Sequence, residues 1–344
     1  MTVWLVGRSS DAPGGDALQM QEAAAVLTAA GLVAECAPAT VQPSAGDTVL
    51  LHNLQRCLEW GDLPERARAA GSRVVLVPLF HDLTRYHAGG RQGLDGAVAR
   101  VLPARVHARI RGRGRSPRRR GARLLGEADA VLLAHEAERA LLRAHYGVDA
   151  PRATVVPIVI PRAAAGAKAP PGDFVASVGR VEPLKDSLGV VRACRDLALP
   201  LWLVGSPSET HPKYAEATLG EHSLSGGWQP GALAYPAART LLGRARVHAL
   251  ASWAEVLGRV TFEAAIEGAA VVHTTAGHGA ACLAGLGPPE GLFLVEPGDG
   301  VGLRRALAGA WERGRPGVDG PLAQRVRDHF TWEAAGPTLV EALR

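Results

Sequence analysis

Two glutamates, Glu255 and Glu263, stand eight residues apart across the start of a predicted helix that runs from about Leu257 to Glu267. Eight helical residues span about 12 Å. Between the two carboxylates, the unpaired backbone N–H groups at the helix start favour a phosphate, and Gly258 lets a ligand approach the backbone closely. One element could therefore hold a hydroxyl-rich group, a diphosphate and a second hydroxyl-rich group in a row. A nucleotide sugar has this layout, although two solvated glutamates, one of them capping the helix, would give the same pattern.

This helix is flanked by two predicted buried strands, 247–250 and 270–274. Strand, helix and strand together form a βαβ unit. In open parallel sheets, ligands bind beyond the carboxyl ends of the strands, so the predicted loop with Glu255 lies where a ligand is expected.

The spacing of Ser252, Glu255, Gly258 and Glu263 resembles the Glu-x7-Glu signature of family-4 glycosyltransferases of bacterial type. The resemblance implies the GT-B fold, an α/β architecture in which two Rossmann-like domains with parallel sheets face each other across a cleft. It also implies that Glu255 binds the hydroxyls of the donor sugar and Glu263 the ribose, while the amides of Leu257 and Gly258 line the cleft. The donor would be a nucleoside-diphosphate sugar, whose sugar is transferred with retention of configuration.

The length of the chain predicts two domains. It has 344 residues, of which 47% are hydrophobic, and single cores stop growing at about 250–300 residues. A stretch rich in Pro, Ala and Gly, 157–172, is the predicted linker. With the GT-B resemblance, we expect an N-terminal Rossmann-like acceptor domain of residues 1–160 plus 330–344. The C-terminal Rossmann-like nucleotide-sugar domain would hold residues 161–329.

The cysteines and the N-terminus indicate a cytoplasmic protein. The four cysteines form no C-x-x-C pair and no metal-ligand cluster, which fits reduced thiols. The first residues enter a predicted strand without the features of a signal peptide, and no long apolar run of membrane-spanning length occurs. We therefore expect a protein that is neither secreted nor membrane-spanning.

Two groups in the first domain could face a reaction centre. Gly14 and Gly15 directly precede a predicted helix, where they form either a tight turn or an open approach for a ligand. They resemble the glycine loop of the family, which faces the transferred sugar and the diphosphate. His81 and Asp82 follow a predicted strand and resemble the strand-then-His pattern of the family's acceptor domain, where the His lines the reaction centre. The resemblance makes His81 a candidate catalytic residue together with Glu255, whereas a lone His is otherwise more often structural.

Arg180 and Lys185 follow the first predicted strand of the second domain, 174–178. Two cations at the carboxyl end of a strand suit a diphosphate, although a pair of surface cations would look the same. The string Ser-Val-Gly-Arg-x4-Lys-Asp resembles the diphosphate motif of the family. No Asp-x-Asp triplet occurs, so the sequence offers no divalent metal site, and no cofactor is expected beyond the donor substrate. Arg180, Lys185 and helix N–H groups would then stabilise the leaving diphosphate.

The segment Arg100–Arg123 contains ten arginines and no acidic residue. Its Gly, Pro and like charges predict a loop between a helix that ends near Leu102 and one that starts near Ala122. The segment is either a solvated basic loop or the site of an anionic partner: a membrane surface with a lipid-linked acceptor, a phosphate-bearing acceptor, or nucleic acid. Nucleic acid is least favoured, because no aromatic residues are interleaved. With membrane binding, the enzyme would be peripheral on the inner membrane face.

In chain order, these motifs predict a metal-independent, retaining glycosyltransferase that moves a hexose-type sugar from a nucleoside-diphosphate sugar to an acceptor the sequence does not identify. Two alternatives remain. A nucleotide-sugar 2-epimerase has the same two-domain fold, and a catalytically degenerate anion- or nucleic-acid-binding protein would need only the basic segment. The Glu-x7-Glu and Arg/Lys patterns favour transfer over both.

Overall fold

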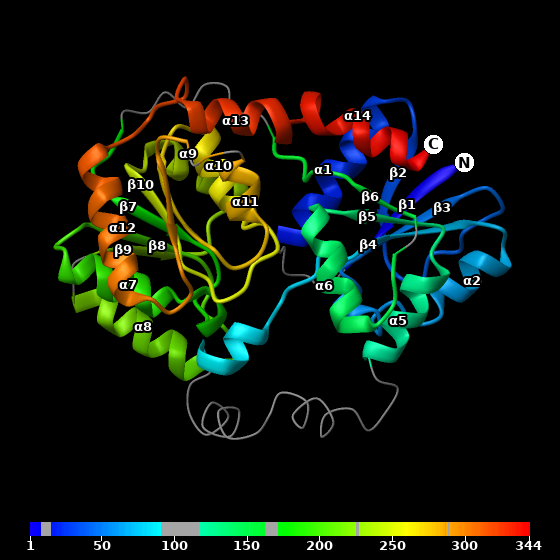
Figure 1. Ribbon diagram of the computed structural model, residues 1–344, viewed down its shortest axis with the longest axis horizontal. Coiled ribbons are helices and arrows are strands. Elements are labelled where there is room, and N and C mark those ends of the chain that lie inside the picture. The colour runs from blue at the N-terminus through cyan, green and yellow to red at the C-terminus, as the bar shows by residue number, and fades with distance from the viewer. Residues whose placement is uncertain are drawn as a thin grey trace. The chain divides into compact units, whose positions relative to one another are not determined.

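The computed structural model describes residues 1–7, 15–90, 117–150, 152–161, 171–224, 227–285, 287 and 289–344. These residues form two six-stranded sheets with parallel pairing (Figure 1). Each sheet is the centre of a compact unit. Of the described residues, unit 1 holds 1–80, 117–161 and 329–344, and unit 2 holds 81–90 and 171–328. The predicted α/β class with two parallel sheets is confirmed.

The sheet of unit 1 has the strand order β2-β1-β3-β4-β5-β6. Its strands are β1 (Thr2–Val6), β2 (Val33–Ala37), β3 (Thr48–His52), β4 (Arg73–Val77), β5 (Ala130–Leu133) and β6 (Ala153–Val155). Every residue of β3 is buried, which is expected of a parallel strand with helices on both faces.

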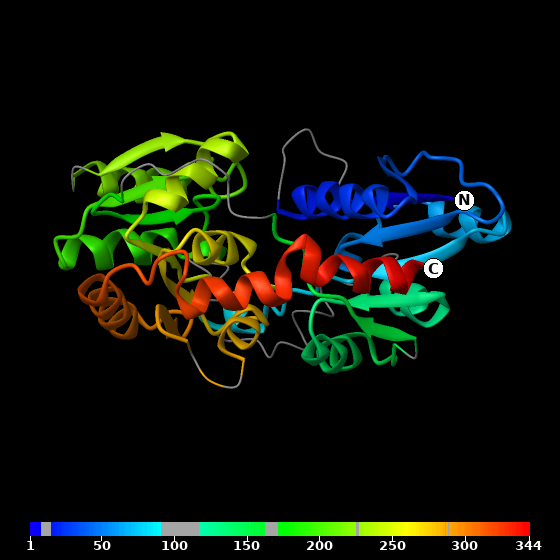
Figure 2. The ribbon, with the colours of Figure 1, turned by 90° about the horizontal axis from the view of Figure 1, so that it is seen from above.

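The helices of unit 1 cover both faces of this sheet. They are α1 (Gly15–Ala29), η1 (Leu54–Arg56), α2 (Leu63–Ala69), α5 (Pro117–Glu127), α6 (Glu136–Tyr146) and α14 (Trp332–Leu343). On one face, Val49 of β3 belongs to a core cluster with Leu124 of α5. The next residue, Leu50, points to the other face, where it lies with Gln19 of α1 and Leu339 of α14. Helices α1 and α14 pack against each other on that face (Figure 2).

The sheet of unit 2 has the order β12-β11-β10-β7-β8-β9. Its strands are β7 (Val175–Val178), β8 (Leu201–Val204), β9 (Trp228–Gly231), β10 (Val247–Leu250), β11 (Ala270–Thr274) and β12 (Leu292–Val295). The predicted βαβ unit is present, because β10 and β11 are parallel neighbours with a helix between them in the chain.

The helices of unit 2 also cover both faces of their sheet. They are η2 (Tyr86–Gly90), η3 (Pro183–Lys185), α7 (Ser187–Asp196), α8 (Pro212–Leu224), α9 (Tyr235–Arg244), α10 (Arg259–Ile266), α11 (Gly279–Ala284) and α12 (Gly300–Arg313). Helix α13 (Pro321–Phe330) leads from unit 2 to unit 1. Val191 of α7 and Leu307 of α12 pack with Ala249 of β10 in the core on one face.

The basic segment is helical earlier than the sequence suggests. A loop was expected up to about residue 121, but α5 begins at Pro117, so that prediction is wrong for the end of the segment. Proline suits the first position of a helix, and the arginines that follow are good helix formers. Arg120 is also bonded locally, since its guanidinium donates to the carbonyl of Cys57 at 3.2 Å and pairs with Glu65 at 3.2 Å. Residues 100–116 lie outside the described part of the chain.

A buried carboxylate ties together the carboxyl ends of two strands in unit 1. Glu138 of α6 accepts the N–H of Phe80, after β4, at 2.7 Å and the N–H of Ala134, after β5, at 2.8 Å. Its side chain is fully buried. Burial raises the pKa of Glu138 to about 7, although the two N–H bonds oppose the shift.

This pKa predicts a pH dependence of stability. Between pH 4.5 and about 7 the folded protein holds the Glu138 proton more tightly than the unfolded chain, so the contribution of this group to the free energy of unfolding falls as pH rises. Denaturant unfolding of wild type and Glu138→Gln at about pH 5 and pH 8 should show a smaller loss in the variant. Glu136→Gln, on the same helix, is the control: its lowered pKa leaves it ionised at both pH values. Equal losses in wild type and Glu138→Gln would contradict the assignment.

Candidate functional site

The loop between β10 and α10 carries the predicted functional residues of unit 2. Helix α10 begins at Arg259, two residues later than predicted, because Gly258 caps it in the left-handed conformation with φ 69°. A side chain at this position would be strained, and its Cβ would lie 2.6 Å from Cε1 of His273 on β11. Leu257 and Gly258 therefore precede the helix, and the free N–H groups of the first turn begin at Arg259.

Glu255 is a buried carboxylate with two donors. Its Oε1 accepts the hydroxyl of Ser252 at 2.7 Å and forms an ion pair with Nζ of Lys185. Only 6% of Glu255 is exposed. Burial opposes ionisation, but the charge and hydrogen bond of Lys185, with smaller contributions from His81 and Ser252, outweigh it and hold the pKa of Glu255 below its usual range. The carboxylate is therefore ionised at neutral pH. Ser252 is held in place by Thr274, whose hydroxyl donates to the backbone carbonyl of Ser252 at 2.7 Å.

Lys185 and Arg180 both lie on the loop that follows β7. Lys185 ends the short helix η3, and the carbonyl of its neighbour Leu184 accepts the N–H of Trp253 at 2.8 Å. This bond joins the Lys185 turn to the Glu255 loop. Arg180 lies 3.1 Å from the buried carboxylate of Glu182. Both predicted diphosphate cations are thus paired with a carboxylate of their own unit.

Glu263 lies in the middle of α10 and is held by two side chains. Its Oε1 accepts from Nε of Arg259 at 2.7 Å and from the hydroxyl of Tyr235 at 3.0 Å. The Tyr235 oxygen in turn accepts from Arg239 at 3.2 Å, and Arg239 pairs with Glu267. These five residues form one network between α9 and α10. It fixes the orientation of the Glu263 carboxylate.

The network and the Glu255 loop contain residues that were not predicted from the sequence. Arg259 precedes Glu263 by four residues, a spacing that places both on one helix face, so it had a detectable signal. Tyr235 and Trp253 had none, because their partners are distant in the sequence.

The candidates expected in the first domain, the glycine pair and His81, do not all lie in unit 1. Gly15 is the first residue of α1, and a Cβ there would meet no atom within 4 Å; Gly14 lies outside the described residues. His81 was assigned to the N-terminal domain, yet it belongs to unit 2, while the preceding Phe80 belongs to unit 1. The charge of His81 contributes to the low pKa of Glu255. The segment that follows His81 also packs through η2 against η3, which ends at Lys185.

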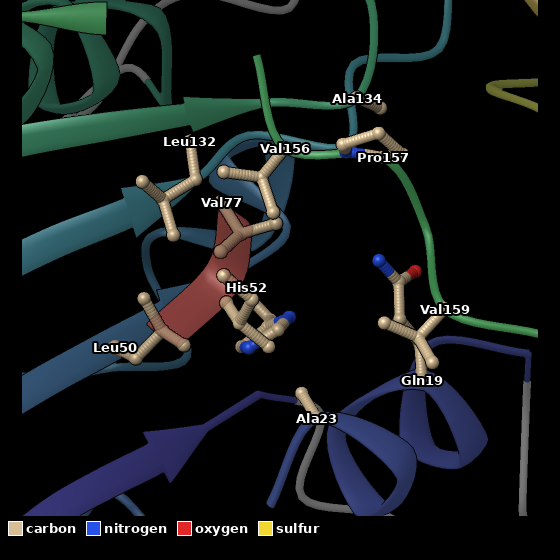
Figure 3. A pocket seen from close by; sticks show the side chains of 11 residues that line it. Gln19, Ala23, Leu50, His52, Val77, Leu132, Ala134, Val156, Pro157 and Val159 are labelled. Atoms are coloured by element: carbon tan, nitrogen blue, oxygen red, sulfur yellow. The ribbon is translucent and has the colours of Figure 1, made fainter. Parts of the chain in front are cut away.

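A small cavity in unit 1 holds a buried histidine (Figure 3). His52, the last residue of β3, extends into it, with Gln19 at its edge. The cavity has about 30 Å³, which leaves room for a few water molecules. Burial lowers the pKa of His52 to about 4, so the ring is neutral at pH 7. The cavity is too small for a sugar or a nucleotide, and it is not a substrate site.

In the described ranges, no three His, Cys, Asp or Glu side chains are grouped to hold a metal ion. No helix within those ranges is long and apolar enough to cross a bilayer.

Comparison with solved structures identifies the fold. Sucrose-phosphate synthase from Thermosynechococcus elongatus matches with a TM-score of 0.75 and 17% identity over 100% of this chain and 98% of that one. Anabaena HepE, solved with UDP and glucose, matches with a TM-score of 0.70 and 17% identity over 99% and 98% of the two chains. The chain has the GT-B fold. A glycosyltransferase of avilamycin A biosynthesis has a TM-score of 0.61 and 17% identity, with 99% of this GT-B chain and 96% of that one covered.

These likenesses show two Rossmann-like domains, as predicted. No protein-family model and no curated protein sequence matches the chain.

The Arg180–Glu182 pair gives a prediction about anion binding by the GT-B site. Glu182→Gln removes a negative charge 3.1 Å from the Arg180 guanidinium. Affinity for a nucleoside diphosphate such as UDP should therefore rise, by about two- to fivefold, because Arg180 is half exposed and its pair is worth little in water. Calorimetry measures the change. Glu216→Gln on α8, which removes an equal charge from an exposed surface, should leave affinity unchanged; weaker binding in Glu182→Gln would refute the role of Arg180.

Proposed function

We propose that the protein is a glycosyltransferase that moves a hexose-type sugar from a nucleoside-diphosphate sugar to an acceptor, with retention and without a metal ion. The observation that carries the proposal is the buried Lys185–Glu255 pair, at the carboxyl edge of a parallel sheet, next to Gly258 and eight residues before Glu263. The GT-B fold and the UDP-glucose complex of HepE support it.

In this proposal each charged group has one task. Glu255, kept ionised by Lys185, accepts hydrogen bonds from the hydroxyls of the donor sugar. Lys185, Arg180 and the N–H groups around Leu257 and Gly258 bind the diphosphate and stabilise its charge as it leaves. Glu263 binds the ribose. Because these groups supply the positive charge, the reaction needs no metal ion or other cofactor.

His81 and the glycines complete the proposed site. His81, near Glu255, contacts the transferred sugar or the acceptor beside the anomeric carbon. By the resemblance to family-4 enzymes, the glycine pair Gly14 and Gly15 is the loop that faces the transferred sugar and the diphosphate. Retention rests on the resemblance to family-4 enzymes alone, in which the leaving phosphate is held to take the acceptor's proton.

The acceptor side of the proposal concerns the basic segment. Arg118 and Arg119 are exposed on the first turn of α5, whereas Arg120 and Arg123 are engaged with Glu65. We propose that the free arginines dock the protein as a peripheral enzyme on an anionic membrane, at the cytoplasmic face, where a lipid-linked acceptor is presented. Nucleic acid is not proposed as a partner.

A panel of radiolabelled nucleotide sugars tests the function. Incubation without acceptor should release the nucleoside diphosphate and free sugar slowly from one donor class, because water replaces the acceptor. Conversion of the sugar to its 2-epimer would favour the epimerase. Binding of none of the donors would favour a degenerate anion-binding protein, and either result would overturn the proposal.

Two variants of the Lys185–Glu255 pair should separate its effect on donor hydrolysis from its effect on the free energy of unfolding. Lys185→Ala should lower donor hydrolysis by about a hundredfold or more, as the loss of one preorganised charge does. It should also destabilise the fold, because it leaves the buried Glu255 charge without its counter-charge, with only the Ser252 hydroxyl as a donor. Lys185→Ala/Glu255→Gln should recover stability in denaturant unfolding but not activity. Hydrolysis by Lys185→Ala within about threefold of wild type would refute the catalytic role.

Membrane docking gives a prediction for the two exposed arginines of α5. Wild-type protein should bind vesicles containing phosphatidylglycerol at low salt and lose most of this binding at physiological salt, because screening acts over about 8–10 Å. Arg118→Ser/Arg119→Ser should weaken vesicle binding about tenfold or more, at roughly 1 kcal/mol per basic residue, while donor hydrolysis stays at wild-type level.

The matched control for docking is Arg304→Ser/Arg305→Ser on α12, which removes the same charge from unit 2 and should keep vesicle binding. Arg120 is left unchanged, since its loss would disturb the contacts with Cys57 and Glu65. If wild type ignores anionic vesicles even at low salt, a soluble acceptor replaces the lipid-linked one.

A further inference from the structure

Trp253 stands at the junction of three parts of the site. It precedes Glu255 by two residues in the loop after β10, and its N–H donates to the carbonyl of Leu184, next to Lys185. Its backbone is therefore fixed to both halves of the Lys185–Glu255 ion pair. Its indole ring contacts two other segments.

The ring of Trp253 packs directly on glycine backbone. A Cβ added to Gly90 would lie 2.7 Å from Cδ2 of the ring, and one added to Gly89 would lie 3.0 Å from Cζ3. A Cβ at Gly298, in the turn after β12, would overlap the six-membered end of the ring. The segment 81–90 and the β12 turn are thus joined through one side chain, and the absence of side chains at the three glycines makes this contact possible.

A second contact joins the same two segments. Arg85 pairs with Glu296 at the end of β12, but the two side chains are 58% and 57% exposed. Exposed ion pairs contribute little to stability, whereas the half-buried Trp253 ring contacts three glycines in two segments. Trp253 is therefore the main anchor of the segment, and the ion pair is secondary.

The other end of the segment is held by unit 1. Phe80 is bonded through its N–H to the buried Glu138, in the core of unit 1. Residues 81–90 pack with unit 2. One crossing of the chain between the units therefore lies near Phe80 and His81, and the candidate catalytic histidine is on the unit 2 side.

We propose that Trp253 is a positioning residue that fastens the segment 81–90 to unit 2. The position of His81 near the Lys185–Glu255 pair is then set by unit 2 and not by unit 1. The anchoring is a property of the fold. Its consequence for sugar transfer rests on the proposed function.

Hydrogen exchange of the peptide covering 81–90 tests the anchor without any assumption about activity. The N–H of His87, bonded to the carbonyl of Leu83 at 2.9 Å, is one reporter. Trp253→Ala should speed exchange in this peptide about tenfold, and Trp253→Phe, which keeps an aromatic ring, should change it less than about threefold. Arg85→Ala, which breaks only the exposed ion pair, should behave like Trp253→Phe.

Gly90→Ala tests the same contact from the other partner. It leaves the Glu255 loop intact, and its methyl group would meet the Trp253 ring at 2.7 Å and the ring of Tyr86 at 2.6 Å. Gly89→Ala, whose methyl group would meet the Trp253 ring alone, at 3.0 Å, is therefore made beside it and should give the same result. Gly90→Ala should also speed exchange, so the result does not depend on Trp253→Ala folding well. Exchange unchanged from wild type in both Trp253→Ala and Gly90→Ala would overturn the proposal.

The kinetic test uses the donor found with the nucleotide-sugar panel. Trp253→Ala and Gly90→Ala should lower kcat about tenfold or more, with KM for the donor and the affinity for the bare nucleoside diphosphate unchanged, because the Lys185–Glu255 pair remains. Trp253→Phe should restore most of kcat. Faster exchange with unchanged kcat would refute the role of His81 positioning, whereas absence of any donor turnover in wild type would refute the proposed function and leave the exchange result standing.

Discussion

The ion pair between Lys185 and Glu255 is the interaction on which the rest of the site depends. A carboxylate that is 6% exposed is costly to ionise, and Lys185 offsets that cost. The pair works only if two loops, one after β7 and one after β10, meet in a fixed register. The bond from Trp253 to Leu184 and the bond from Thr274 to Ser252 hold that register.

Unit 2 also contains ion pairs between an arginine and a glutamate. Arg180 lies against Glu182, Arg259 against Glu263, and Arg239 against Glu267. The charges of these pairs therefore cancel within the unit. In the proposed function, the diphosphate would have to share donors with carboxylates that are already in place. The benefit is preorganisation, because these side chains have already lost their rotamer freedom. Specificity then comes from where the carboxylates lie rather than from free positive charge.

Periodicity and turn residues predicted the alternation of strands and helices and placed Glu255, Lys185 and Glu263 on one parallel sheet. They failed where a single backbone angle or a tertiary bond decides the outcome. Gly258 in the left-handed region delays α10. Pro117 starts α5 inside a segment that reads as a loop by charge alone. Tyr235 could not be found, because its link to Glu263 crosses 28 residues of sequence.

His81 illustrates why a histidine after a strand cannot be assigned to a domain by sequence. The strand β4 and Phe80 belong to unit 1, so the next residue is expected there too. What decides its place is whether a neighbouring unit offers a surface that binds backbone closely. The Trp253 ring provides such a contact with Gly89 and Gly90. These glycines are far from Trp253 in the sequence, so no local pattern predicts that they meet. A residue at the start of a segment anchored in this way is positioned by unit 2, so the position of His81 depends on the Trp253 contact and not on the strand that precedes it.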